Sequence, residues 1–370
     1  MKIECAELWH VAMPLISPWR TAYGEDAAIH SVLVRMSANG VSGWGESCPL
    51  YAPTYSPESA LSAYETCREF FLPRIVGKDF EGPQQLLDSL VAFRGNQFAK
   101  AAIETAWWAL DCKTRAVPLW QALGGTQPRI FCGEDIGIQN SIDHLLALVE
   151  NAAKRGYPRI KLKIRQNWDI EVLAAVRSSF PGLIVHVDCN GGYDLDEHWE
   201  TLRKLDRFEL AMIEQPLSDT DLFDHARLQN RIATPICLDE SIKSPRDFRT
   251  ALSMGACRAI NVKPGRVGGL CNAVTIHDMA RNAGITAWVG SMLESGVGAG
   301  ICAALATLPG FTYPPDLFPS GRLYREDISA SEIQLDERCG LDLALSAACE
   351  IEPDLDRLKR ASVARCELRA

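Results

Sequence analysis

The sequence predicts an α/β protein that combines a TIM-like (β/α) barrel with an α+β capping domain. Five charged residues, Lys163, Asp188, Glu214, Asp239 and Lys263, follow one another at intervals of 25, 26, 25 and 24 residues (188 − 163, 214 − 188, 239 − 214 and 263 − 239). Such an interval accommodates one strand, one helix and two loops. Each charge ends a short apolar run bounded by turn-forming residues, which is typical of a buried parallel strand. The first 125 residues lack this period, which indicates a separate domain.

The capping domain is expected at residues 1–125. Segments 2–13 and 29–37 have the alternating character of strands, and segments 57–72 and 97–116 have the apolar pattern of helices. Strands followed by helices are the pattern of an α+β domain.

The barrel is expected at residues 126–324. Its strands are predicted at 130–138, 159–164, 183–188, 211–214, 235–239, 259–263 and 286–290. Helices are predicted at 141–156, 169–180, 195–206, 219–230, 244–254 and 267–283. The last unit is irregular, with a helix at 297–308 followed by Phe311-Thr-Tyr-Pro-Pro315, so we expect a modified (β/α)7β barrel. The βα rhythm stops near residue 325, and we expect the tail, 325–370, to pack on the capping domain.

Composition excludes several classes of function. The 370 residues carry a formal net charge of −9, so nothing favours nucleic acid or an anionic membrane surface as a partner. No apolar stretch is long enough to span a membrane, and the first residues lack the pattern of a signal peptide, which predicts a cytoplasmic protein. The 13 cysteines are scattered without a Cys-x-x-Cys pair, which favours small buried side chains over disulfides or zinc.

The charged strand ends indicate a metal site with basic residues beside it. In a (β/α) barrel the C-terminal strand ends meet on one face, so the five charges and Lys161 should converge. One charged strand end is usually a solvated residue, but independent surface residues have no reason to keep the strand period. Three unpaired carboxylates would repel, whereas a divalent cation with oxygen ligands, Mg²⁺ or Mn²⁺, would stabilise them.

The lysines predict proton transfer. Lys161 and Lys163 are two apart on one strand and share a face, and Lys263 lies across the barrel. Two ammonium groups beside a cation should lower a lysine pKa towards the working pH, which makes Lys163 a candidate base. A metal flanked by two lysines suits removal of a proton next to the carboxylate of a small-molecule substrate.

Six motifs occur in order along the predicted barrel. They are Lys161-Leu-Lys163, Val187-Asp-Cys-Asn190, Ile213-Glu-Gln-Pro-Leu217, Leu238-Asp-Glu-Ser241, Asn261-Val-Lys-Pro-Gly-Arg-Val-Gly-Gly269 and Ser291-Met-Leu-Glu-Ser295. Together they resemble the enolase superfamily, muconate-lactonizing-enzyme subgroup, and within it the o-succinylbenzoate synthase / N-acylamino acid racemase branch. The resemblance covers essentially the whole chain, including Gly43-Trp-Gly-Glu46 in the capping domain.

The resemblance implies roles for these residues. It implies that Asp188, Glu214 and Asp239 are Mg²⁺ ligands and that Lys163 and Lys263 are the acid/base pair. It also implies that Lys161 supports Lys163 and the substrate carboxylate, and that Asn190 and Glu240 lie beside the metal ligands. Two histidines are expected to be structural: His186 inside the barrel and His277 on a helix.

Substrate specificity is expected to depend on the capping domain and the last strand ends. The resemblance implies that loops 16–24 and 51–55 face the substrate, which nominates Trp19, Arg20 and Tyr55. At the seventh strand end it nominates Ser291, Met292 and Glu294. Relatives usually carry a glycine at Ser291 and an Arg-Ala pair at Ala299-Gly300, so this chain departs from them where the distal part of the substrate would lie.

The favoured interpretation is a Mg²⁺-dependent lyase of the o-succinylbenzoate synthase type. Its substrate would lose a proton to Lys163 and then eliminate water. The alternative is an N-acylamino acid racemase, in which Lys163 and Lys263 act on opposite faces of one carbon, and one protein could do both. A muconate-type cycloisomerase or a dipeptide epimerase is a more distant alternative. A non-catalytic barrel would be expected to lose some of the charged set. We also expect a homo-oligomer.

Overall fold

A seven-stranded parallel sheet forms the centre of the computed structural model, which describes residues 1–344 and 352–370. The strands pair in chain order, so that each lies beside the one that follows it. Adjacent strand ends are in register: Lys163 pairs with Asp188, and Asp188 pairs with Glu214. The seven strands are β5 (Glu134–Ile136), β6 (Ile160–Lys163), β7 (Val185–Asp188), β8 (Ile213–Glu214), β9 (Ile236–Leu238), β10 (Ala259–Val262) and β11 (Thr286–Val289).

An irregular segment at 311–316 closes the sheet into a barrel. On one side Thr312 N donates to Ala287 O (3.2 Å) and Asp316 N to Val289 O (3.0 Å). On the other side Gly133 N donates to Pro315 O (2.9 Å). Prolines in this segment cannot donate to a sheet ladder, so no regular eighth strand forms. The prediction of a (β/α) barrel with an irregular last unit is confirmed.

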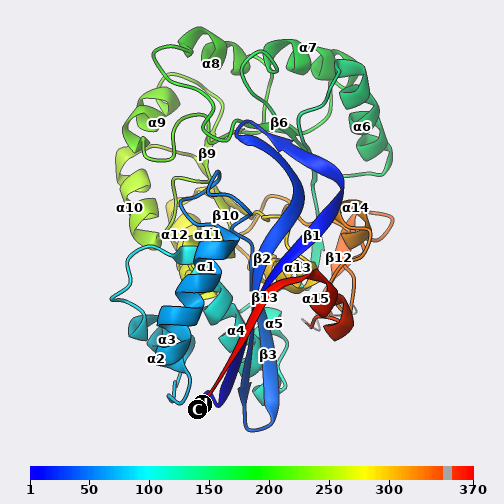
Figure 1. Ribbon diagram of the computed structural model, residues 1–370. Coiled ribbons are helices and arrows are strands. Elements are labelled where there is room, and N and C mark those ends of the chain that lie inside the picture. Colours follow the sequence, from blue (N-terminus) through cyan, green and yellow to red (C-terminus); the bar gives the residue numbers. More distant parts are fainter. Residues whose placement is uncertain (345–351) are drawn as a thin grey trace.

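Helices between the strands surround the barrel (Figure 1). They are α6 (Ile142–Lys154), α7 (Ile170–Ser179), α8 (Trp199–Leu205), α9 (Leu222–Gln229), α10 (Pro245–Met254), α11 (Pro264–Val267), α12 (Leu270–Ala283) and α13 (Gly296–Ala306). Instead of one helix over 267–283, the structure has α11 and α12. Gly268 and Gly269, with φ of 87° and 113°, separate them in a conformation that favours glycine.

The capping domain is an antiparallel sheet of order β13-β1-β2-β3 packed against helices. Its strands are β1 (Cys5–Thr21), β2 (Gly24–Ala38), β3 (Val41–Ser47) and β13 (Ser362–Arg369), and its helices are α1 (Ala60–Thr66), a π-helical turn (Cys67–Phe71), α2 (Leu72–Ile75), α3 (Pro83–Ser89), α4 (Gln97–Arg115) and α5 (Leu119–Ala122). A Cβ on Gly43 would lie 2.1 Å from Leu110 N, so this glycine allows β3 to approach α4. The helix expected over 57–72 contains the π turn, which lies between α1 and α2.

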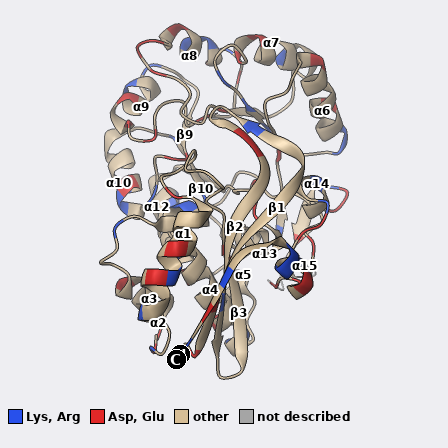
Figure 2. Cartoon of the chain, viewed as in Figure 1, with Lys and Arg blue, Asp and Glu red and all other residues tan. Residues whose placement is uncertain are grey.

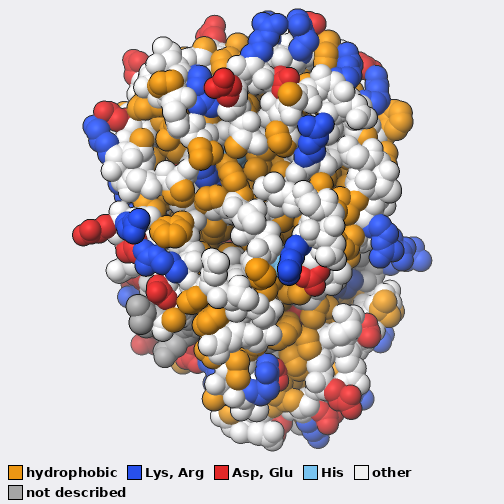
Figure 3. Space-filling model, turned by 180° about the vertical axis from the view of Figure 1, so that it is seen from behind, with side chains coloured by type: hydrophobic (Ala, Val, Ile, Leu, Met, Phe, Trp, Pro, Cys, Tyr) orange, Lys and Arg blue, Asp and Glu red, His pale blue; other side chains and the backbone are white. Residues whose placement is uncertain are grey.

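The hairpin β1–β2 is longer than expected, because segment 16–24 is not a loop. The two strands remain paired to Thr21 and Gly24, and the hairpin reaches over the barrel (Figure 1). Charged residues of both signs occur along the outer helices (Figure 2), and acidic and basic side chains are interspersed on the rear face (Figure 3).

The expected first barrel strand, 130–138, is two strands. β4 (Arg129–Phe131) pairs with β12 (Gly340–Asp342) outside the barrel, and only β5 joins the parallel sheet. The short helix α14 (Ser320–Leu323) lies just before the predicted tail. In the tail, α15 (Leu355–Ala361) precedes β13, which pairs with β1. Part of the predicted tail, 345–351, lies outside the described residues, and the division at 125 and 324 stays a prediction. None of the helices in the described residues is long and apolar enough to cross a membrane.

Candidate active site

Three carboxylates meet at the C-terminal edge of the barrel strands. Asp188 ends β7, Glu214 ends β8 and Asp239 follows β9 directly. All three are fully buried, and one oxygen from each lies within 4.8 Å of the others. The three carboxylates that the strand-end spacing predicted to converge do lie together, and this cluster is here called the acidic triad.

Neutral donors fix the position of each triad member. Asn190 N donates to Asp188 Oδ1 (2.9 Å), and Asn261 Nδ2 donates to Glu214 Oε1 (2.7 Å). The Tyr55 hydroxyl donates to Asp239 Oδ1 (2.9 Å). Each carboxylate thus has one oxygen held by an uncharged donor, and its other oxygen lies on the side of the lysines.

The three predicted lysines surround the acidic triad. Lys161 Nζ lies 2.9 Å from both Asp188 Oδ2 and Glu214 Oε2, and Lys163 Nζ lies 2.6 Å from Asp188 Oδ2. Lys263 Nζ lies 2.9 Å from Asp239 Oδ2. Lys163 and Lys263 therefore contact different members of the triad, one on the β7 side and the other on the β9 side.

The pKa shifts in this cluster follow from ion pairing. Burial alone would raise the pKa of Asp188, but Lys161 and Lys163 outweigh it and hold that pKa well below its usual range. Burial disfavours the ammonium form of Lys163, but Asp188 outweighs this effect and raises the lysine pKa. From the sequence, a lowered pKa was expected for Lys163 because a cation was assumed beside the lysine. The side chains by themselves shift this pKa in the opposite direction, upwards.

The acidic triad suits a divalent cation. Its donors are all carboxylate oxygens, which hard cations prefer. Glu214 Oε2 lies 2.9 Å from Lys161 Nζ but has no aligned hydrogen-bond partner among the described residues. A buried carboxylate oxygen in that position is a suitable metal ligand.

Asn190 and Glu240 lie beside the triad, as the resemblance implied. Asn190 Nδ2 donates to Glu240 Oε1 (2.9 Å), and Asn190 Oδ1 accepts from Lys163 Nζ (3.2 Å). Burial, with the nearby charge of Asp188, raises the pKa of Glu240 to about 7. These two residues connect the Lys163 side of the site to the strand that carries Asp239.

Capping-domain residues cover the site and leave a small catalytic pocket of about 30 Å³. Tyr55, Trp19 and Met292 line it, together with Ser291. Tyr55 is 8% exposed, and its hydroxyl also accepts from Lys263 Nζ (3.2 Å). The pocket is therefore bounded by both domains.

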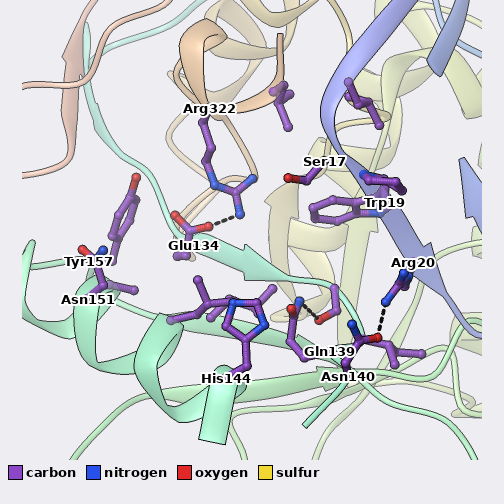
Figure 4. Close-up of a pocket in the computed structure, with 18 of the residues that line it drawn as sticks. Ser17, Trp19, Arg20, Glu134, Gln139, Asn140, His144, Asn151, Tyr157 and Arg322 are labelled. Carbon is purple, nitrogen blue, oxygen red and sulfur yellow. Dashed lines mark hydrogen bonds and ion pairs between the residues drawn. The ribbon is translucent and has the colours of Figure 1, made fainter. Parts of the chain in front are cut away.

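Two nominated residues do not line this pocket. Arg20 pairs with Glu25 (2.5 Å) and donates to Asn140 (2.5 Å) in a neighbouring cavity (Figure 4). Trp19, its neighbour on the strand, faces the pocket, and adjacent residues of a strand point to opposite sides. Glu294 accepts from Met292 N (2.8 Å) and so supports the loop from beneath. Arg20 and Glu294 therefore do not line this pocket, and their contact with the substrate stays a prediction.

Sequence reasoning missed two acidic residues of the site. Asp135, the middle residue of the short β5, lines the pocket with Oδ1 unpaired among the described residues. Asp316 pairs with Arg159 (2.5 Å) and lies 3.3 Å from Lys161 Nζ. Asp135 precedes Lys161 by 26 residues (161 − 135), so it also follows the strand period. It was missed because the strand predicted at 130–138 was too long and placed Asp135 in its interior.

Arg266 was also missed. It forms a close ion pair with Asp239 and donates to the Tyr55 hydroxyl (3.1 Å) and to Asn261 O (2.6 Å). The two histidines lie where the sequence placed them. His186 lies inside the barrel, with Nδ1 3.0 Å from the Tyr313 hydroxyl and Nε2 3.6 Å from Glu214 Oε2. His277 lies on α12 and accepts from Gly310 N (2.8 Å).

Comparison with known families agrees with this geometry. Residues 4–124 match the mandelate racemase / muconate lactonizing enzyme N-terminal domain, and residues 144–339 match the enolase C-terminal domain-like family. The chain belongs to the enolase superfamily.

Individual superfamily members are similar over nearly their whole length. An o-succinylbenzoate synthase from Geobacillus kaustophilus is 44% identical over 90% of this chain and 89% of that protein. An N-succinylamino acid racemase from Thermus thermophilus is 43% identical over 89% of each chain. The crystal structure of an enolase superfamily member from Listeria innocua has a TM-score of 0.94 at 36% identity and covers 100% of this chain and 99% of that chain.

Proposed function

We propose that this protein is a Mg²⁺-dependent o-succinylbenzoate synthase, which acts in the cytoplasm in menaquinone biosynthesis. The observation that carries the proposal is the placement of Lys163 and Lys263 against different members of a buried acidic triad. Several relatives named o-succinylbenzoate synthase, at 36–44% identity, support this choice of substrate.

The acidic triad would hold the metal through Asp188, Glu214 and Asp239. Bound there, Mg²⁺ would supply positive charge to the substrate carboxylate and so favour loss of the neighbouring proton. The site is fully buried, so these charges act with little screening by water.

The lysines would move the proton. Neutral Lys163 Nζ takes the proton α to the carboxylate and becomes an ammonium group. When the C–O bond breaks on the same face, this ammonium group returns the proton to the departing hydroxide, which leaves as water. Lys263 stays protonated and stabilises the negative charge that develops on the substrate.

An N-succinylamino acid racemase is the second candidate. The same two lysines would act on opposite faces of one α-carbon, and the Thermus thermophilus relative carries that name. A muconate-type cycloisomerase and a dipeptide epimerase would use the same residues, but relatives of 43–44% identity carry neither name. A non-catalytic barrel would not need all three carboxylates and all three lysines to be retained.

Substitution of the two lysines separates the reactions. We expect Lys163→Ala to abolish dehydration in the ultraviolet assay of a cyclohexadiene carboxylate. Lys263→Arg keeps the positive charge but cannot act as a base, so it should retain part of the dehydration. The same variant should stop racemisation of an N-succinylamino acid.

Exchange of the α-proton with D₂O, followed by NMR for each enantiomer, identifies the base on each face. In Lys263→Arg, exchange should persist for one enantiomer only. Undiminished exchange in the Lys163→Ala, Lys263→Ala double variant would contradict the assignment of both lysines. Dehydration by the wild-type protein without racemisation would identify it as a synthase alone.

A further inference from the structure

The last strand, β13, is an edge strand of the capping sheet. It pairs with β1 on one side, and within the described residues no strand lies on its other side. Figure 1 shows it in red, running from α15 to the C-terminus. An unpaired strand edge presents a row of N–H and C=O groups that can bind another strand. The outer edge of β13 is therefore a main-chain binding surface.

The pairing of β13 with β1 determines which main-chain groups point outward. Ala370 N donates to Glu4 O (2.9 Å). Main-chain groups alternate in direction along an antiparallel strand, so the even-numbered residues next to Ala370 also bond to β1. The N–H and C=O groups of Arg365, Glu367 and Arg369 therefore point away from the sheet. None of them has a main-chain partner in the part of the chain that the structure describes.

The charges of β13 are complementary to those of a second copy of the same strand. Two such edges related by a two-fold axis can pair only outward-pointing groups with outward-pointing groups, which limits the possible registers. An axis at Cys366 places Arg365 of each copy opposite Glu367 of the other. An axis at Arg365 or at Glu367 would place like charges opposite each other, which is unfavourable. An axis nearer either end of β13 would pair fewer residues.

The side chains on both faces of β13 favour the same register. On the solvent-facing side, Arg365 Nη2 lies 3.6 Å from Glu367 Oε2 of its own strand, so charges of opposite sign already alternate there. On the other side, Ala364, Cys366 and Leu368 pack against the core of the capping domain but are only partly buried. With the axis at Cys366, Ala364 is opposite Leu368 and the two Cys366 side chains are opposite each other. Apolar groups thus meet apolar groups.

We propose that the outer edge of β13 pairs with the same edge of a second copy of this chain, antiparallel and with the two-fold axis at Cys366. The outward main-chain groups of Arg365 and Glu367 would bond across the axis, and the two four-stranded sheets would become one continuous sheet. No proline interrupts β13. This contact gives the expected homo-oligomer a specific interface, and it does not depend on which reaction the acidic triad performs.

Exchange of the two charges tests the register. In sedimentation velocity over a concentration series, the wild type should associate. Arg365→Glu places glutamates opposite each other, so it should raise the dissociation constant of the dimer at least about tenfold. The double variant Arg365→Glu, Glu367→Arg restores opposite charges across the axis. Its dissociation constant should return to within about threefold of the wild-type value.

Arg35→Glu is the matched control, because Arg35 and Arg365 bind the same carboxylate. Their guanidinium groups lie 2.7 and 2.8 Å from the oxygens of Glu7, but Arg35 is on β2, inside the sheet. The control variant should change the dissociation constant less than about twofold. An equal loss of association in Arg35→Glu and Arg365→Glu would assign the effect to the contact with Glu7 within one chain and overturn the proposal.

Hydrogen exchange locates the contact on the strand. The amides of Arg365 and Glu367 should be protected in the associated wild type and should exchange rapidly in Arg365→Glu. The amide of Cys366 points towards β1 and should be protected in both, which shows that the strand remains folded. The proposal is overturned by a wild type that stays monomeric, by a double variant that does not regain association, or by rapid exchange of the two outward amides in the associated wild type.

Discussion

At the scale of single residues, the candidate metal site depends on uncharged neighbours as much as on its carboxylates. Asn261 holds Glu214 Oε1, and Gly290 approaches Asn261 so closely that a Cβ there would lie 2.1 Å from Asn261 Oδ1. The glycine before Ser291 therefore gives Asn261 the room it needs. Neither requirement follows from the spacing of charges.

Glu214→Gln tests the acidic triad. The change removes one anionic oxygen donor while keeping the side-chain size, so we expect Mg²⁺ affinity to fall at least about tenfold and activity to fall on the order of 100-fold. Titration calorimetry and the dehydration assay measure these effects. The control is Glu150→Gln on the surface of α6, which should leave both unchanged. Full turnover of the wild type in buffer containing EDTA would contradict the assignment of a metal to the acidic triad.

The sequence revealed those site residues that end regular strands. Asp188, Glu214 and Lys263 were visible because each follows an apolar run at the barrel period. Asp316 was not, because it ends the irregular segment that closes the barrel through loop hydrogen bonds. Arg266 lies on the short helix α11 and reaches the site only through tertiary packing, which periodicity does not encode.

At the scale of elements, the β1–β2 hairpin departs most from expectation. The first strand was expected to end at residue 13, and Pro14 and Pro18, which cannot donate to a ladder, follow that point. The register of β1 against β2 instead shifts between Pro14 and Trp19, and pairing resumes beyond the irregularity. An irregular register accommodates proline in a sheet, so the strand continues to Thr21. Cross-strand pairing thus overrides the local signal.

The same hairpin carries a histidine pair, buried His10 and half-buried His30, that predicts a pH dependence of stability. His10 Nε2 and His30 Nδ1 are 3.0 Å apart, and burial, with the nearby His30, lowers the pKa of His10 to about 4. An unfolded histidine has a pKa of about 6.5. Between those values the unfolded chain binds a proton that the folded chain does not, so this contribution to stability is full above pH 6.5 and lost as the pH falls towards 4.

His10→Gln should reduce this dependence. We expect the fall in Tm between pH 7 and pH 5 to be smaller in the variant than in the wild type, by roughly 2 °C. Thermal unfolding followed by circular dichroism at the two pH values measures it. His144→Gln, at an exposed position of α6, is the control and should follow the wild type. An equal fall in His10→Gln and the wild type would contradict the prediction.

At the scale of the whole molecule, carboxylates of the capping domain bind the beginnings of two barrel helices. Glu46 accepts from Gly298 N (2.8 Å) in α13, and Glu104 accepts from Leu270 N (2.7 Å) in α12. Unpaired amides and the helix dipole favour anions at these positions. The two domains are therefore docked by buried polar contacts near the site, and Tyr55 extends this docking to the acidic triad.

Tyr55→Phe tests the contribution of this docking to catalysis. The variant keeps the ring but loses the hydroxyl's contacts with Asp239, Lys263 and Arg266. Hydrogen bonds to charged groups contribute about 1.5–3 kcal/mol, so kcat/KM should fall by about 10- to 100-fold. Tyr51→Phe, on the same loop but 66% exposed, should change it less than about twofold. Equal kinetics in Tyr55→Phe and the wild type would show that the contact is irrelevant to the reaction.

The pairing of β1 with β13 has a consequence for the order of folding. Cys5 pairs with Arg369, so one of the first strands to be synthesised has its outer edge open until the last strand arrives. The barrel strands instead pair with their neighbours in sequence and close short loops. We expect pulsed hydrogen exchange during refolding to protect the amides of β6–β10 first and those of β1 that face β13 last. Simultaneous protection of both sets would show that the capping sheet does not wait for its final strand.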